Sequence, residues 1–114
     1  MSQETIKYFS KDVLSMKDDV DGAKMWGIGL KNVMLTYFEV SPNSHFPMHR
    51  HENEQITMVL EGELFFQIDK GEICVKAGEV VAVPSNASHS VYTKKKFVKA
   101  VDAWSPVRED YVTN

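Results

Sequence analysis

The stretch "HRHENEQ" at residues 49–55 holds the residue types best suited to binding a metal ion. His49 and His51 stand at alternate positions, and Gln55 follows four residues after the second of them. Alternate residues of a strand point to one side, so the two imidazoles would share a face if the strand predicted at "ITMVL" began early enough. The pair is either part of a metal site or an ordinary pair of loop histidines.

A metal site needs further ligands, and His89 is the candidate that would complete it. It opens a later apolar run, so only the fold could bring it to the pair. Imidazole binds Zn, Fe, Ni, Cu and Mn, and three imidazoles with an oxygen from Gln55 would leave positions open for water or substrate. His45 precedes Pro47, where we expect the chain to change direction, and we assign it a lining or structural role.

A second group of chemically capable residues lies near the C-terminus. Asp102 and Trp104 share a predicted strand face with Val98 and Ala100. A carboxylate at the end of an apolar face is costly to bury unless it has a partner or a task. Arg108 could offer its planar guanidinium either to Asp102, as a structural ion pair, or to the carboxylate of a substrate.

The elements that must position these residues are predicted to be strands. Short apolar runs separated by turn residues are typical of an all-β sandwich or barrel. The predicted strands are 24–30, 33–40, 55–61, 63–69, 72–77, 80–83, 89–93 and 96–103. The "DKGE" sequence predicts a hairpin turn with Gly71 at positive φ. At the C-terminus, "SPVREDYV" predicts one or two helical turns with Ser105 as N-cap and Pro106 at the first helical position.

The composition indicates one ordinary domain of 114 residues, with 43% hydrophobic and 25% charged residues. A net charge of -3 argues against a protein that binds nucleic acid through phosphates. No secretory signal or membrane-length apolar stretch is visible, and Cys74 is the only cysteine, so we expect a cytoplasmic protein. The run "VMLTYFEV" is apolar on both faces, which favours a homodimer in which a partner subunit covers the outer face.

Two spaced motifs give the chain a resemblance to the small single-domain cupins. The first cupin motif, G-x5-HxH-x3-E-x6-G, is matched here from Asn43 to Gly62. The second, G-x5-PxGxxH-x3-N, is matched from Gly78 to Thr93. The sequence departs from the motifs at Asn43 and Asn86 (for glycine), at Gln55 (for glutamate) and at Thr93 (for asparagine). Asparagine tolerates the left-handed backbone that glycine adopts, so the first two departures are mild.

The resemblance implies a double-stranded β-helix, or jelly-roll barrel, over about residues 33–103, with an N-terminal arm (1–23) and a C-terminal tail (104–114) in a single domain. It also implies a single divalent transition metal ion, Zn, Ni, Fe or Mn, bound by His49, His51, Gln55 and His89. An amide at 55 adds no negative charge, so the site would favour an anionic ligand at its open positions.

The tail "DAWSPVRED" resembles a cupin subgroup that linearises unsaturated uronates in pectin degradation. That resemblance implies that Asp102 and Arg108 are catalytic and that Trp104 and Arg108 bind substrate, although Trp104 replaces a usual phenylalanine. We therefore expect metal-dependent isomerase or lyase chemistry on a small carboxylated or sugar-derived substrate. The alternatives are an Fe-dependent dioxygenase and a non-enzymatic small-molecule-binding cupin that acts as a sensor or store.

Overall fold

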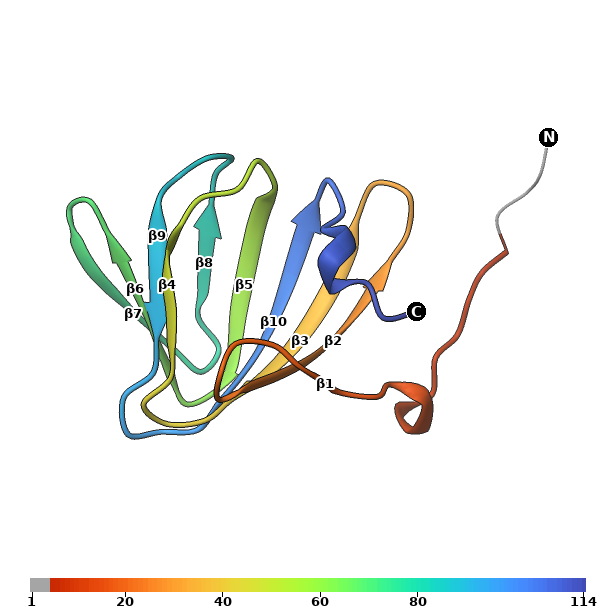
Figure 1. The fold of residues 1–114 in the computed structure, drawn as a ribbon, viewed down its shortest axis with the longest axis horizontal. Coiled ribbons are helices and arrows are strands. Elements are labelled where there is room, and N and C mark those ends of the chain that lie inside the picture. Colours follow the sequence, from red (N-terminus) through yellow and green to blue (C-terminus); the bar gives the residue numbers. More distant parts are fainter. Residues whose placement is uncertain (1–4) are drawn as a thin grey trace.

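The computed structural model describes residues 5–114, and within them the chain folds into two antiparallel sheets that form a jelly roll (Figure 1). One sheet has the strand order β1-β2-β3-β10-β5-β8, and the other has the order β4-β9-β6-β7. The strands are β1 (Lys17–Asp18), β2 (Ala23–Gly29), β3 (Met34–Val40), β4 (His45–His49), β5 (Glu54–Glu61), β6 (Glu63–Ile68), β7 (Gly71–Lys76), β8 (Val80–Val83), β9 (His89–Tyr92) and β10 (Val98–Ser105). The all-β, jelly-roll prediction is confirmed.

Period-two alternation explains how the six-stranded sheet builds the barrel interior. Along β3, β5 and β10, alternate side chains are buried while the intervening ones are exposed or half-buried. The register places Asp102 of β10 opposite both Thr36 of β3 and Thr57 of β5. Trp104 lies opposite Gln55 in the next inner row. The sheet therefore brings several polar side chains together beside a core that includes Met25, Val59, Phe66 and Val98.

All eight predicted strands are present with small shifts of their ends, but two strands were not predicted. β1 is too short to carry a pattern of its own. β4 contains Pro47, which we expected to mark a change of direction; instead, the chain continues as a strand through it. Proline is tolerated there because β4 is the edge of its sheet, and the pairing with β9 is irregular between Phe46 and His49.

The backbone at one predicted turn and at two motif positions confirms the sequence-based predictions. Gly71 adopts a φ of 127° at the hairpin between β6 and β7, as predicted. Asn43 and Asn86, which replace the motif glycines, have φ values of 60° and 64°. Their left-handed backbone is the conformation that glycine would supply, and asparagine is among the few other residues that adopt it readily.

The C-terminal prediction was wrong in its details. Ser105 is still part of β10, where its hydroxyl donates to the Asn32 carbonyl at 2.7 Å, so it caps no helix. The helical segment is a single 3-10 turn, η2 (Glu109–Tyr111), preceded by Arg108. Beyond it the tail pairs with β2, because the Thr113 amide donates to the Gly27 carbonyl at 2.8 Å.

The tail covers the inner face of β2 and β3, where Tyr111 packs edge-on against the buried ring of Phe38 with centroids 5.6 Å apart. At the other terminus, the segment that contains η1 (Lys11–Val13) extends away from the two sheets (Figure 1). Residues 1–4 of the expected N-terminal arm lie outside the described residues. Within the described part of the chain, no helix is long and apolar enough to span a membrane.

Candidate metal centre

Three histidines from two distant segments of the chain meet at one end of the barrel. His49 ends β4 and His89 opens β9, and the two are cross-strand partners. His51 lies in the connection between β4 and β5 rather than at the start of a strand, so the expected common strand face is not what aligns the pair. The ring centroids are 4.4 Å apart for His49–His89, 5.1 Å for His51–His89 and 5.4 Å for His49–His51.

Each ring is held by a backbone carbonyl two residues away in the sequence. The Nδ1 atoms of His49, His51 and His89 lie 2.7, 2.9 and 2.8 Å from the carbonyl oxygens of Pro47, Asn53 and Ala87, respectively. A carbonyl oxygen only accepts, so each Nδ1 carries a proton, and the lone pair of the neutral ring is then on Nε2. Metal-binding histidines commonly show this outer hydrogen bond, which fixes the ring orientation.

Burial keeps two of these rings uncharged. His89 is 2% exposed, and burial lowers its pKa from the ordinary histidine value of 6.5. Burial is also the main cause that lowers the pKa of His51, and the charge of Arg108 acts in the same direction. A neutral imidazole is the form that binds metal, so burial favours the ligand form of His51 and His89. The ligand-capable nitrogens of the three histidines all lie within 4.8 Å of one another.

Two buried acceptor atoms at this cluster lack a protein partner. Within the described part of the chain, neither His51 Nε2 nor Gln55 Oε1 accepts a hydrogen bond, although both are sealed from solvent. Unpaired buried polar atoms are costly, and a cation is the partner that would satisfy a lone pair on each. The residues present therefore fit a divalent ion, with three imidazole nitrogens and one amide oxygen as the available donors.

A buried carboxylate lies beside the cluster. Asp102 is 5% exposed and accepts from the Thr36 hydroxyl at 3.0 Å, from the Thr57 hydroxyl, and from Gln55 Nε2 at 3.4 Å. Burial raises the pKa of the Asp102 carboxyl, and the hydrogen bonds from Thr57, Thr36 and Gln55 oppose that rise. A carboxyl in such surroundings is a candidate for proton transfer.

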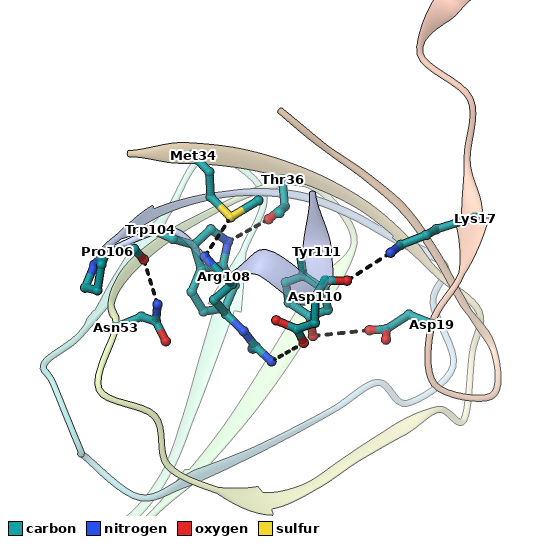
Figure 2. Close-up of polar contacts among 10 residues, drawn as sticks. All are labelled: Lys17, Asp19, Met34, Thr36, Asn53, Trp104, Pro106, Arg108, Asp110 and Tyr111. Atoms are coloured by element: carbon teal, nitrogen blue, oxygen red, sulfur yellow. Dashed lines mark hydrogen bonds and ion pairs between the residues drawn. The ribbon is translucent and has the colours of Figure 1, made fainter. Parts of the chain in front are cut away.

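Arg108 pairs with Asp110 and not with Asp102, so of the two alternatives that the sequence left open, the structural ion pair with Asp102 is not formed. Its Nη2 lies 2.9 Å from Asp110 Oδ2, and its guanidinium carbon stands 4.1 Å from the Tyr111 ring centroid and 5.1 Å from that of Trp104 (Figure 2). η2 brings Asp110 within reach of Arg108, while the Asp102 oxygens are occupied by threonine hydroxyls. The Arg108 amide also contacts Met34 Sδ at 3.2 Å, which holds the tail against β3.

One pocket joins these groups, with an empty volume of about 520 Å³ that includes space open to solvent. Its polar lining includes His49, Gln55, His89, Asp102 and Arg108, and its walls are the aromatic and aliphatic side chains of Phe38, Phe46, Phe66, Val91, Trp104 and Tyr111, among others. An apolar pocket with a few convergent polar groups is the usual form of a small-molecule site.

Sequence reasoning missed three residues of this site. Thr36 and Thr57 hold the Asp102 carboxylate, and Tyr111 lines the pocket from the tail. Alternation along "EQITMVL" already places Thr57 on the same strand face as Gln55. The register that pairs Thr57 with Asp102 cannot be predicted from the sequence of either strand alone. His45 is exposed on β4 and lies outside both the histidine cluster and the pocket lining, so it has no lining role.

A comparison with known protein families identifies the family of this chain. Residues 36–101 match the model of the cupin domain. This chain belongs to the cupin family. No match was found among curated proteins.

Solved structures superpose over most of the cupin chain. An RmlC-like cupin from Shewanella frigidimarina has a TM-score of 0.85 at 23% identity, and the alignment covers 97% of this chain and 100% of that chain. KdgF from Halomonas sp. has a TM-score of 0.83 at 19% identity, with 91% and 98% covered. The polyketide cyclase RemF from Streptomyces resistomycificus has a TM-score of 0.81 at 25% identity, with 92% and 82% covered. The first two likenesses, at their low identity, concern the fold alone.

Proposed function

We propose that this cupin is a metal-dependent enzyme that acts on a small carboxylated or sugar-derived substrate by isomerase or lyase chemistry. The observation that carries the proposal is the shared pocket. Two histidines of the cluster (His49 and His89), a buried carboxylate and a guanidinium line it, so a bound molecule would meet all of these groups at once. The likeness to a polyketide cyclase supports small-molecule chemistry on this barrel, although fold alone does not decide function.

In this proposal His49, His51, His89 and Gln55 hold the ion. The ion would supply Lewis acidity to a substrate hydroxyl or carbonyl. The chain's own contribution begins with the ring orientation set by the three backbone carbonyls, which presents the Nε2 atoms without rearrangement. The apolar walls of the pocket exclude water around the reacting groups.

Asp102 is the proposed proton acceptor. A carboxylate has about four lone-pair directions, and Thr36, Thr57 and Gln55 occupy three of them. The remaining capacity is available to a substrate proton in the pocket that Asp102 lines. Burial raises the pKa of this carboxyl, which makes it a stronger base than an exposed aspartate.

Arg108 is the proposed binding group for a substrate carboxylate. Its guanidinium has five N–H donors, and the ion pair with Asp110 occupies only one terminal nitrogen. The rings of Tyr111 and Trp104 hold the guanidinium in place by cation–π contact. Its remaining N–H donors therefore keep a fixed orientation.

Turnover of an unsaturated uronate tests the proposal, with the ultraviolet absorbance of its conjugated double bond as the signal. At saturating metal, Asp102→Asn should lower turnover by at least about 100-fold, the contribution expected of a positioned base. His89→Ala should lose both bound metal and turnover, because it removes one ligand and unbalances the site. His45→Ala is the matched control and should keep both, since His45 is exposed outside the cluster.

Three outcomes would contradict the proposal in different ways. Wild-type turnover by Asp102→Asn removes that residue from proton transfer. Saturable binding of acidic sugars without product by the metal-loaded protein identifies a binding module instead of an enzyme. Turnover that stops when oxygen is removed, with the metal still bound, identifies an oxygenase.

A further inference from the structure

The hydrogen bonds around Asp102 have a direction that can be worked out atom by atom. The indole nitrogen of Trp104 can only donate, and it donates to Thr36 Oγ1 at 2.8 Å (Figure 2). Thr36 is completely buried and has one hydroxyl proton, which it gives to Asp102 Oδ2 at 3.0 Å. This first arm of the network therefore runs from Trp104 through Thr36 to the carboxylate.

A second arm reaches the same carboxylate from the metal cluster. Gln55 Nε2 donates to Thr57 Oγ1 at 2.9 Å, and the Thr57 hydroxyl gives its proton to Asp102 Oδ1. Gln55 Nε2 also lies 3.4 Å from Asp102 Oδ1 directly. Both threonine hydroxyls thus point at Asp102, and an acceptor-only carboxylate satisfies both arms together.

The network leaves only one satisfied orientation for the Gln55 amide. If the amide were turned by 180°, its oxygen would face Thr57 Oγ1, whose proton is already used, and Asp102 Oδ1, which has none to give. With Nε2 held on Thr57 and Asp102, the Oε1 atom is the buried acceptor without a partner. It is therefore the oxygen that the amide presents to an ion.

We propose that Asp102 and Thr57 are positioning residues that fix the Gln55 amide with its oxygen toward the ion, and that Asp102 supplies from behind Gln55 the negative charge that the ligand set lacks. The inference rests on the proposed metal centre but not on turnover. It assigns Asp102 a role in metal binding that is separate from proton transfer. It also gives Thr57 a function, which the sequence motifs do not.

This arrangement predicts that glutamine at position 55 and aspartate at position 102 depend on each other. A carboxylate at 55 would stand where Gln55 Nε2 now lies, next to Asp102 Oδ1 and to a threonine with no second proton. Two carboxylates at that separation repel, and neither has the donor that the amide provides. A charge at 55 is therefore tolerated only if the charge at 102 is removed.

A double-mutant cycle with Co²⁺ as the probe tests the proposal. The metal-free wild type, Gln55→Glu, Asp102→Asn and the double variant would be titrated, with the dissociation constant and the visible d–d spectrum as readouts. Each single variant should bind Co²⁺ at least about 10-fold more weakly, the usual cost of losing an outer-shell partner. The double variant, in which the charge and the donor change places, should return to within about 3-fold of wild type and recover the wild-type spectrum.

Thr57→Val and Thr36→Val form a matched pair that keeps the charge at 102. Both threonines are fully buried and both donate to Asp102, but only Thr57 also contacts Gln55. Thr57→Val should weaken Co²⁺ binding by about 10-fold, and Thr36→Val by less than about 3-fold. If an Asp102 variant does not fold, this pair decides the proposal.

Tighter binding by Gln55→Glu in the wild-type background, additive losses in the double variant, or equal effects of the two threonine substitutions would overturn the inference. A wild type that binds no Co²⁺ would instead overturn the metal centre and the proposed function with it. Co²⁺ binding with an intact cycle but no turnover of any acidic sugar would leave this inference standing and contradict the enzyme.

Discussion

At the scale of single residues, the site depends on side chains that are buried in their uncharged form. His51 and His89 have pKa values lowered chiefly by burial, so they stay neutral where an exposed histidine would begin to protonate. In the unfolded chain both return to the ordinary value of 6.5. The folded and unfolded states therefore bind different numbers of protons in mildly acidic solution.

This difference predicts that the two histidines contribute less to the stability of the metal-free protein as the pH falls below 6.5, whereas the raised pKa of Asp102 acts in the opposite direction. In that range the two histidines bind protons in the unfolded state but not in the folded state. Their contribution to the free energy of unfolding therefore decreases until the pH is below their lowered pKa values in the folded state. The thermal midpoint, followed from about pH 8 to about pH 5, should fall less steeply in His89→Gln than in the wild type. Equal slopes for the two proteins would show that His89 does not contribute.

At the scale of elements, the C-terminal tail is what completes the pocket. Gly27 of β2 lies under it, with its amide 3.1 Å from Thr113 Oγ1, and a Cβ at this position would meet the Tyr111 carbonyl oxygen. The close approach explains why glycine occupies a buried strand position here. Arg108 and Tyr111 belong to the same tail and line the pocket. The close contact between the tail and Gly27 therefore also determines where these two side chains lie.

Gly27→Ala should therefore loosen the tail and lower the free energy of unfolding by about 1–3 kcal/mol, the usual cost of overpacking. Metal binding should be unchanged, because the histidines belong to other elements. Gly29→Ala is the matched control in the same strand. Its Cβ would meet a Val112 methyl at 3.2 Å, which can shift, so we expect a smaller loss. Urea unfolding and proteolysis of the tail measure both; equal losses would contradict the argument.

The same scale shows what the sequence could and could not predict. Alternating apolar runs located the strands, and motif spacing identified His49, His51 and His89 as a cluster, because both depend on order along the chain. The relation of Asp102 to Thr36 and Thr57 depends on register across three strands, which no single segment encodes. The sequence left Asp102 and a substrate as alternative partners of Arg108, and the Asp110 contact was not foreseen because it depends on a short 3-10 turn that carries no pattern of its own.

At the scale of the whole molecule, the six-stranded sheet has an apolar outer face. Leu35, Ala103 and Ile56 form a row across β3, β10 and β5, and Leu35 and Ile56 are 44% and 54% exposed. Met58 and Val80 extend the same face on β5 and β8. A contiguous exposed apolar surface is typical of a protein–protein interface, so the homodimer stays a prediction with a defined location.

The predicted dimer can be broken by charge on this row. Leu35→Lys combined with Ile56→Lys should shift the protein to a monomer in sedimentation velocity, because lysines facing each other in the interface would have to lose water. The barrel interior is untouched, so Co²⁺ binding should persist. Ile73→Lys on β7 is the matched control, since it is 40% exposed on the other sheet and should leave the oligomeric state unchanged. A wild type that already sediments as a monomer would contradict the homodimer.

The carbonyls of Pro47, Asn53 and Ala87 have a further consequence for how the protein would acquire a metal ion in a cell. Since they orient the imidazoles within the folded chain alone, uptake of a cation at the candidate site would require no reshaping of the barrel, and exchange of one ion for another would not require unfolding. Such a preassembled cradle would impose its own donor geometry on the occupant, although three imidazoles and an amide are ligands that several divalent ions accept. Selection among divalent ions would then depend on this geometry, on the ligand types and on which ions the cell supplies, rather than on raw affinity alone.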